Sequence, residues 1–495
     1  MFNKIKLYLQ KNENIILLII LLAAFIIRLK YFSMNSAIWW DEGDYLSTAK
    51  RWGGLSYLED TWYYRRTPFL PLLWAGLYRL GATETILRIT ELVFSTLLIL
   101  GIYLLAKEMF NNKVIGLIAA GSAVFNKIHL FLTTRLMTEI PSTTFLVFGL
   151  YFFWRGYIKK EKSKYIYLAA LFLSLAIMTR MATFLVLIPL TLYILIKEKK
   201  DIFKNKQIWI SLLIIAIIMS PFIFLYKTHV GGVSDFLRHY TVGEESSGSF
   251  VPEEYLGLKG IWLYFMSHLI DFGYLLFIVF VITLILYIYP LILGIDLILK
   301  NEELKEKLLV LLIILIPIIY HGIFSLYVEE RYLLWSFPVI YALIGFGLYY
   351  LYEQIKKYSK NIAIAALLVL IFVNSYLIYQ DTNILVFAKK DTYYEERLAS
   401  EYIKDHTTKD DLIYANPLPK VIYYSERNTK NFPRTIEEFE EEIKKTKPKY
   451  ILISFIEQTK PWMQEIIQVP PPYLRLENVF TEQQPLVFVF RVENG

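Results

Sequence analysis

The chain of 495 residues contains no cysteine and only six histidines. Without cysteine it can form no disulfide, no thiolate nucleophile and no zinc–thiolate site. The sequence also lacks the His-Glu-x-x-His, Walker and Gly-x-Ser-x-Gly patterns, and its polar C-terminal part has no glycine-rich phosphate loop. No internal repeat or low-complexity tract is found. Carboxylates and arginines are therefore the first groups to consider for chemistry.

Long apolar runs are the main feature of the sequence. Hydrophobic residues make up 56% of the chain and aromatic residues 17%, a composition typical of a membrane protein with interfacial aromatic belts. A run of about twenty apolar residues can cross a bilayer as a helix, and we count about eleven such runs. They lie at 14–32, 86–106, 114–132, 138–154, 165–179, 181–196, 208–226, 269–290, 308–327, 332–352 and 362–379. The expected fold class is an α-helical polytopic membrane protein.

Lysines and arginines occupy every second connection between these runs. They precede the first run and follow the second, fourth, sixth, eighth and tenth. The positive-inside rule then predicts a cytoplasmic N-terminus and a multi-pass protein of the cell membrane. The net charge of +7 is explained by these topology signals and does not call for nucleic acid as a partner.

The predicted external segments divide the chain into domains. We expect a transmembrane domain over 1–380, with a catalytic first loop at 33–85 and a candidate lid at 227–268. Residues 381–495 are polar and predict a small extracytoplasmic α/β domain. Its expected helices are Glu395–His406 and Thr435–Lys445, and its expected strands are Asp411–Ala415, Tyr450–Phe455, Tyr473–Phe480 and Pro485–Val492. In the first loop, helices are expected near Asp44–Trp52 and Pro68–Leu80.

An acidic cluster directly follows the first apolar run, in the segment Trp39–Tyr45. Asp41, Glu42 and Asp44 fall within four residues, and on a helix Asp41, Asp44 and Tyr45 would share one face. Carboxylates beside hydrocarbon are costly unless they serve a function, which favours a catalytic carboxylate at the membrane surface. The alternative is an acidic turn that only caps a helix.

Further charged residues fall at predicted outer ends of the runs, on the same side as Asp41. They are Arg66, Arg135, Glu139, Arg180 and Arg331. The spacing of Arg135 and Glu139 predicts one shared helix face. A guanidinium fork binds two phosphate oxygens, so the arginines are candidates for holding a lipid phosphate. Taken singly, each could also be an interfacial charge that reaches into water.

The order of these features resembles the C-fold glycosyltransferases of the protein O-mannosyltransferase and aminoarabinose transferase superfamily. The matching motifs are Asp41-Glu42-Gly43-Asp44-Tyr45; Tyr63-Tyr64-Arg65-Arg66-Thr67-Pro68; Gly81 with Glu84 and Arg88; Arg135 with Glu139; Thr179-Arg180; and Arg331-Tyr332 with Pro338. The resemblance covers roughly residues 10–350. The extra acid Asp44 and the Arg66-Thr67-Pro68 segment depart from the usual pattern and leave the donor sugar open.

The resemblance implies a hexosyltransferase that uses a sugar donor carried on a polyprenyl (dolichyl) monophosphate and acts on the extracytoplasmic side. Asp41, aided by Glu42, would act as general base on an acceptor hydroxyl of a protein, lipid or glycan, and the anomeric configuration would invert. Asp44, Tyr45 and Glu139 would bind the acceptor or a divalent cation. Arg66, Arg135, Arg180 and Arg331 would hold the donor phosphate. Partial desolvation is expected to raise the pKa of Asp41.

Three alternatives remain open. Trp39-Trp40-Asp41-Glu42-Gly43 also resembles a motif of oligosaccharyltransferases, although there it belongs to the C-terminal domain; this reading implies transfer from a lipid diphosphate. A transporter or flippase would have in-membrane charges near the midplane rather than at one rim. A receptor or scaffold would work through the C-terminal domain and tolerate loss of Asp41.

Overall fold

A computed structural model describes residues 13–56, 66–229, 231–232, 257–324, 329–456, 459–481 and 487–493. The described residues form two compact units. The helical unit contains 13–32, 88–229, 231–232, 257–324 and 329–386, and the α/β unit contains 33–56, 66–87 and the residues from 387 onward. The expected boundary near 380 therefore lies close to the end of the helical unit, but the first loop groups with the C-terminal residues.

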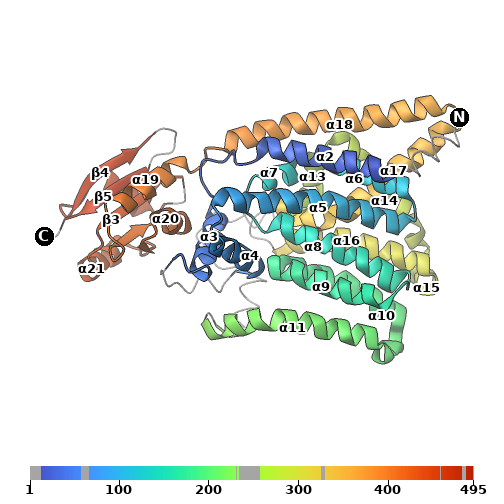
Figure 1. Cartoon of the computed structure of the whole chain (residues 1–495), viewed down its shortest axis with the longest axis horizontal. Coiled ribbons are helices and arrows are strands. Elements are labelled where there is room, and N and C mark those ends of the chain that lie inside the picture. Colours follow the sequence, from blue (N-terminus) through green and yellow to red (C-terminus); the bar gives the residue numbers. More distant parts are fainter. Residues whose placement is uncertain are drawn as a thin grey trace. The chain divides into compact units, whose positions relative to one another are not determined.

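The helical unit is a bundle of long apolar helices that run side by side (Figure 1). Its helices are α2 (Glu13–Tyr31), α5 (Glu84–Phe110), α6 (Lys113–Ala123), α7 (Lys127–Thr133), α8 (Glu139–Phe153), α9 (Ser163–Thr179), α10 (Leu187–Glu198), α11 (Lys206–His229), α13 (Leu258–Phe272), α14 (Tyr274–Ile288), α15 (Ile295–Lys300), α16 (Glu302–Phe324), α17 (Phe337–Lys356) and α18 (Lys360–Lys389). Short turns extend several of them: η2 (Trp154–Ile158), η3 (Met181–Val186), η4 (Lys199–Lys204) and η7 (Glu330–Ser336).

Each expected membrane span contains a helix. Within the described residues, eight helices are long and apolar enough to cross a membrane, and the bent pair α6 and α7 would make a ninth. The two remaining expected spans are the shorter helices α8 and α9. The fold class predicted from the apolar runs is confirmed.

The bend between α6 and α7, which measures 63°, is explained by a buried arginine. Arg28 on α2 donates from Nη1 to the main-chain oxygen of Val124 at 3.3 Å, and Val124 lies at the end of α6. Its Nε donates to Ser95 Oγ at 2.5 Å. A broken helix leaves carbonyl groups without helical partners, and this guanidinium satisfies one of them inside the bundle.

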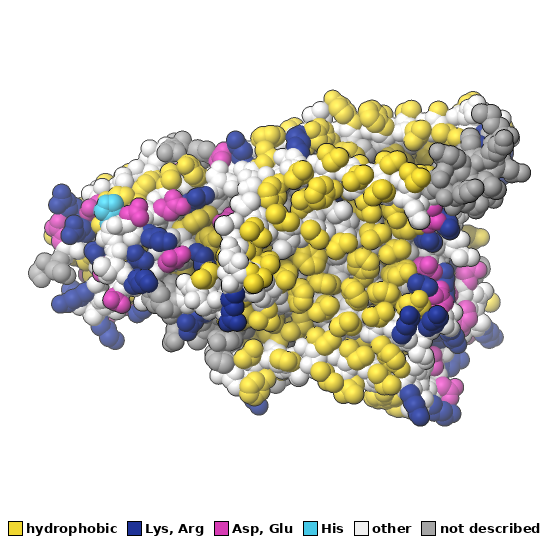
Figure 2. Space-filling model, in the orientation of Figure 1, with side chains coloured by type: hydrophobic (Ala, Val, Ile, Leu, Met, Phe, Trp, Pro, Cys, Tyr) yellow, Lys and Arg dark blue, Asp and Glu magenta, His cyan; other side chains and the backbone are white. Residues whose placement is uncertain are grey.

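The outside of the helical unit is apolar. Figure 2 shows a broad hydrophobic belt over the bundle, with lysine, arginine and acidic side chains gathered beyond its right-hand edge in that view. Large exposed side chains in the belt include Ile19 and Ile26 of α2, Leu213 of α11 and Phe372 of α18. An exposed belt of this size is the surface expected of a protein solvated by lipid.

The two helices expected in the first loop are present, and they belong to the α/β unit. They are α3 (Trp40–Trp52) and α4 (Phe69–Arg79), and Arg79 Nη2 donates to the main-chain oxygen of Trp52 at 3.0 Å. The left-handed Gly81 (φ +84°) ends the connection after α4. Leu72 of α4 and Leu80, which directly follows it, are exposed apolar side chains of the kind found at a membrane interface.

The C-terminal part is a five-stranded sheet in the order β2-β1-β3-β5-β4. The strands are β1 (Leu412–Ala415), β2 (Asn428–Lys430), β3 (Tyr450–Ser454), β4 (Leu474–Phe480) and β5 (Val487–Val492). The first three are parallel, and β5 pairs antiparallel with both β3 and β4. Helices α19 (Tyr394–Asp405) and α20 (Leu418–Ser425) cover one face, while α21 (Ile436–Thr446) and α22 (Pro461–Gln468) cover the other.

The helix α3 packs against this C-terminal part. Tyr424 Oη accepts a hydrogen bond from the main-chain nitrogen of Ile38 at 2.9 Å, and Tyr423 Oη donates to Glu84 at 3.1 Å. Lys50 on α3 pairs with Glu426 at 2.9 Å. The first loop and the C-terminal residues thus share one folded unit, a relation that the sequence pattern did not predict.

Two parts of the structure differ from the expected elements. Residues 258–272 form helix α13, so the last part of the candidate lid at 227–268 is helical. Residue 230 and residues 233–256 of that segment lie outside the described residues. In the C-terminal part, α20, β2 and α22 were not expected, because they are short and two of them start at a proline-rich turn where helical periodicity cannot be read.

The ion pairs of Glu426 predict an acid-sensitive contact with α3. Burial raises the pKa of Glu426, but Lys50 and Lys404 outweigh it and hold the pKa below its ordinary value. A depressed folded pKa contributes stability above the unfolded value of about 4.3, and this stability is lost as the pH falls through the folded value. We expect Glu426→Gln to weaken protease protection of 40–52 at neutral pH and to change little at about pH 3. Equal loss of protease protection at both pH values would show that the charge of Glu426 does not stabilise this contact.

Candidate functional site

The predicted site residues fall into two sets, one in each unit. Asp41, Glu42, Asp44, Tyr45 and Arg66 belong to the α/β unit, whereas the set Arg135, Glu139, Arg180 and Arg331 belongs to the helical unit. The geometry within each set is described in turn.

Helix α3 begins with a cap that uses one of the three clustered acids. The carboxylate of Glu42, three residues after Trp39, accepts the main-chain N–H of Trp39 at 2.7 Å and is fully buried. An acceptor at this position satisfies an N–H group that has no helical partner. Glu42 therefore has a structural role at the start of α3, which was the alternative considered for the whole cluster.

Asp41 and Asp44 lie on one face of α3, as their spacing predicts, and both contact Arg66. Arg66 Nη2 is 3.0 Å from Asp41 Oδ1 and 2.9 Å from Asp44 Oδ2. The guanidinium also lies 5.7 Å from the ring centre of Tyr45. Asp41 is more accessible than Asp44, with side-chain exposures of 23% and 8%. The more accessible carboxylate is the better placed of the two to meet a substrate.

The charges of this set stabilise one another. Burial lowers the pKa of Arg66, but Asp41 and Asp44 outweigh it and raise the pKa above its ordinary value. A neighbouring cation in turn favours the ionised form of each carboxylate. Arg66 therefore pairs with the acids of α3 in this structure. Its expected role in binding the donor phosphate stays a prediction.

In the helical unit, two arginines converge on one buried carboxylate. Glu139 is the first residue of α8, and its Oε1 lies 2.9 Å from Arg180 Nη1 and 3.2 Å from Arg331 Nη1. Arg180 also donates to Thr138 Oγ1 at 3.1 Å, and Arg331 pairs with Glu329. The breaks between α9 and η3 and before η7 bring the two arginines to the end of the bundle where α8 starts.

Arg135 lies in the connection between α7 and α8, so the prediction that it shares a helix face with Glu139 is wrong. Helix α7 ends at Thr133 and α8 begins at Glu139, and the chain between them is not helical. Arg88 fixes this connection by donating to the main-chain oxygen of Thr134 at 2.8 Å. Arg135 is fully buried, and its guanidinium lies 5.9 Å from the ring centre of Phe131.

One buried carboxylate near this set was missed by the sequence analysis. Asp271 on α13 is fully buried, and neither of its carboxylate oxygens has a hydrogen-bond partner among the described residues. Glu330 of η7 and Lys127 of α7 lie within electrostatic reach of it. The signal in the sequence that could have identified it is an aspartate near the start of the apolar run 269–290. Buried ionisable groups in a membrane bundle are candidates for function by default.

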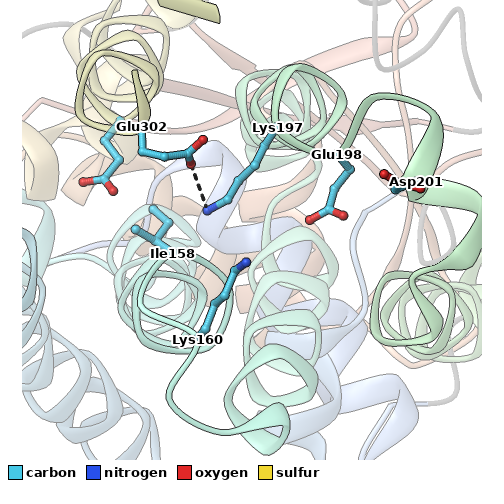
Figure 3. A pocket seen from close by; sticks show the side chains of 7 residues that line it. Ile158, Lys160, Lys197, Glu198, Asp201 and Glu302 are labelled. Carbon is cyan, nitrogen blue, oxygen red and sulfur yellow. Dashed lines mark ion pairs between the residues drawn. The ribbon is translucent and has the colours of Figure 1, made fainter. Parts of the chain in front are cut away.

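A pocket lies at the opposite end of the bundle, where α8 ends (Figure 3). Its volume is about 380 Å³, and its lining residues are Ile158, Lys160, Lys197, Glu198, Asp201, Glu302 and Glu306. Lys197 approaches Glu302 at 3.5 Å, and Tyr157 Oη donates to Glu198 at 2.8 Å. None of the predicted site residues lines this pocket, so it is not the site predicted from the sequence.

Comparisons with known proteins agree with the expected fold class. Residues 65–224 match the sequence family of dolichyl-phosphate-mannose-protein mannosyltransferases. ArnT of Cupriavidus metallidurans in the apo state has a similar structure, with a TM-score of 0.68 at 11% identity over 95% of this chain and 97% of that one. The chain therefore has the fold of ArnT, and its residues 65–224 are similar to the mannosyltransferase family.

A second solved structure is also similar. The apo oligosaccharyltransferase of Archaeoglobus fulgidus gives a TM-score of 0.68 at 12% identity, over 90% of this chain and 70% of that one. A search of curated proteins finds no match. At such low identities the two structures establish the fold, and the family match is limited to residues 65–224. The fold and the long apolar helices are those of a multi-pass membrane protein.

The acids of this C-fold chain were also considered as ligands for a cation. Among the residues that the structure describes, no three histidine or acidic side chains converge in a way that could hold a metal ion. The most obvious pair, Asp41 and Asp44, is bridged by Arg66 instead.

Proposed function

We propose that this protein transfers a hexose-type sugar from a polyprenyl (dolichyl) monophosphate to an acceptor hydroxyl on the extracytoplasmic side of the cell membrane, with inversion and with Asp41 as general base. The observation that carries the proposal is the geometry of α3. Asp41 and Asp44 share one face, Arg66 holds both, and only Asp41 keeps appreciable exposure. The basic residues in every second connection support a cytoplasmic N-terminus.

In the proposed step, the Asp41 carboxylate accepts the proton of the acceptor hydroxyl while the acceptor oxygen forms a bond to the anomeric carbon. The bond from this carbon to the phosphate oxygen breaks, and the lipid phosphate leaves with the electron pair. Arg66 fixes the orientation of Asp41, and Asp44 holds Arg66 in place. General base catalysis of this kind contributes typically 10²- to 10⁴-fold to the rate.

The lipid phosphate is assigned to the arginines of the helical unit. Arg180 and Arg331 both contact Glu139, which fixes the direction of their side chains at the bundle end. Preorganised guanidinium groups stabilise the charge that grows on a leaving phosphate. Related structures support a polyprenyl phosphate: ArnT has been solved bound to undecaprenyl phosphate, and the Archaeoglobus enzyme with a dolichol-phosphate and an inhibitory peptide.

Replacing Arg180 by lysine is expected to raise the KM for the lipid donor by about 10-fold or more, because lysine keeps the charge but loses the two-pronged phosphate contact. Arg155→Lys is the matched control, since Arg155 pairs with Glu161 at the opposite end of α8. Titrations of the lipid donor in a detergent-based transfer assay measure the KM of both variants. An unchanged KM for Arg180→Lys would remove this residue from phosphate binding.

The direct test of the function is transfer of label from radiolabelled polyprenyl-phosphate hexoses to an extract of host membranes. Release of sugar from the lipid, with an acid-stable labelled product, supports the proposal and identifies the acceptor class. The likeness to an oligosaccharyltransferase makes transfer from a lipid diphosphate the second candidate. A parallel arm with a lipid-diphosphate oligosaccharide and a peptide acceptor tests it, and label movement only in that arm would overturn the monophosphate proposal.

A further inference from the structure

The sheet of the α/β unit contains a topological switch point between β1 and β3. The chain leaves the carboxyl end of β1 into α20, which packs through Val421 on one face of the sheet. It leaves the adjacent β3 toward α22, which packs through Trp462 and Met463 on the other face. In open α/β sheets the crevice at such a point is where ligands usually bind.

Here the crevice is filled by the protein's own polar side chains. Asn416 and Ser454 exchange two hydrogen bonds, from Asn416 Nδ2 to the Ser454 main-chain oxygen at 2.7 Å and from the Ser454 main-chain nitrogen to Asn416 Oδ1 at 2.8 Å. Ser454 Oγ donates to Glu396 at 2.5 Å, and Glu396 pairs with Lys420 at 2.6 Å. Tyr393 lies 3.3 Å from the Lys420 ammonium, measured to its ring centre.

This cluster fixes the first turn of α20. Lys420 is the third residue of the helix, and the side chains of Lys420 and Glu396 are almost completely buried. A buried ion pair at this distance tolerates little movement, because separating the charges inside the protein is costly. The position of the neighbouring Pro419 is therefore set by the sheet rather than by solvent-exposed contacts.

Pro419 in turn meets the helix that carries the acidic pair. A Cβ atom added to Gly43 would lie 2.8 Å from the carbonyl carbon and the carbonyl oxygen of Pro419. Side-chain Cβ atoms do not approach backbone so closely, so only glycine allows α3 and α20 to be this near. Gly43 lies between Asp41 and Asp44, so the contact falls at the turn of α3 that bears both carboxylates.

We infer that the C-terminal part of this protein is the positioning element of the transferase site: the cluster at the switch point fixes α20, and the Pro419–Gly43 contact fixes α3 and with it Asp41. The inference rests on the proposed function, in which Asp41 is the base. Gly43 touches no substrate in this scheme and acts through Asp41. A misplacement of about 1 Å at a reacting group can cost about 10²-fold in rate.

The test compares Gly43→Ala with Gly76→Ala. Both glycines lie inside helices, but a Cβ on Gly76 meets nothing within 4 Å, so only the first substitution forces α3 away from α20. We expect Gly43→Ala to lower kcat by about 10- to 100-fold with the donor KM changed less than about twofold, and Gly76→Ala to leave both near wild type. Wild-type kcat in Gly43→Ala would overturn the inference.

Hydrogen exchange separates this inference from the proposed function. Amides of residues 40–52 should exchange faster in Gly43→Ala than in wild type, while amides of β1 and β3 keep their protection and show that the sheet is folded. If the wild-type protein transfers no sugar, the proposed function fails. The positioning of α3 by α20 is refuted separately, if the amides of α3 exchange at the same rate in Gly43→Ala and in wild type. Loss of protection in β1 and β3 as well would also contradict the inference, because the disturbance would then not be local to α3.

Discussion

Replacing Asp41 by asparagine is expected to lower the turnover number by about 10²- to 10⁴-fold, the range attributed to a general base. Asparagine has nearly the same shape as aspartate and can still accept a hydrogen bond from Arg66, which lies 3.0 Å from Asp41 Oδ1. It cannot accept a proton from a hydroxyl group at neutral pH. The loss should therefore appear in kcat, with the binding of the lipid donor largely preserved.

Two comparison variants make the Asp41 experiment specific. Asp410→Asn changes an exposed aspartate of the α/β unit and is expected to leave turnover unchanged. Asp44→Asn neutralises one of the two carboxylates that pair with Arg66 but leaves the base, so its loss of turnover should be smaller than that of Asp41→Asn. Turnover by Asp41→Asn within about twofold of wild type would exclude this residue as the base.

Replacing Lys420 by methionine is expected to destabilise the sheet of the α/β unit by about 3 to 5 kcal/mol, because it leaves the buried Glu396 carboxylate without its cation. Methionine fills a similar volume, so the loss of charge rather than a cavity is tested. Hydrogen exchange of the β1 and β3 amides in the full-length protein measures the effect, since these strands are central.

A second substitution in the same pair should restore most of this stability. In the double variant Lys420→Met with Glu396→Gln, no unpaired charge is buried, and glutamine still offers an acceptor to Ser454 Oγ. Lys444→Met on the exposed side of α21 is the control for loss of a lysine. If the single and double variants are equally unstable, the ion pair is not what stabilises this region.

The parts of the fold that follow from local patterns could be predicted. The apolar runs identify the bundle, and the i, i+3 spacing of Asp41 and Asp44 places both on one face of α3, because these features depend only on helix geometry. Strands β1, β3, β4 and β5 could be read from their alternating residues within a residue or two. Glu42 lies at the third position of α3, where an acidic residue is a capping signal that can be recognised in the sequence.

Other features depend on contacts between distant residues, and periodicity does not encode them. Arg66 meets Asp41 across 25 positions, and Glu396 meets Lys420 only through the packing of α19 on α20. The pairing of Arg135 with Glu139 on one helix was wrong because a connection, not a helix turn, separates them. The sharing of one unit by the first loop and the C-terminal part likewise comes from tertiary contacts.

The hydrogen bond from Ile38 to Tyr424 joins residues 386 positions apart. At a synthesis rate of about 5–20 residues per second, the segment that precedes α3 is complete about 20 to 80 s before its partner exists. Throughout that interval the acidic helix has none of its contacts with α20. A nascent chain that ends before α20 would lack the contacts that order its base, so readiness for chemistry comes only after α20 has been synthesised.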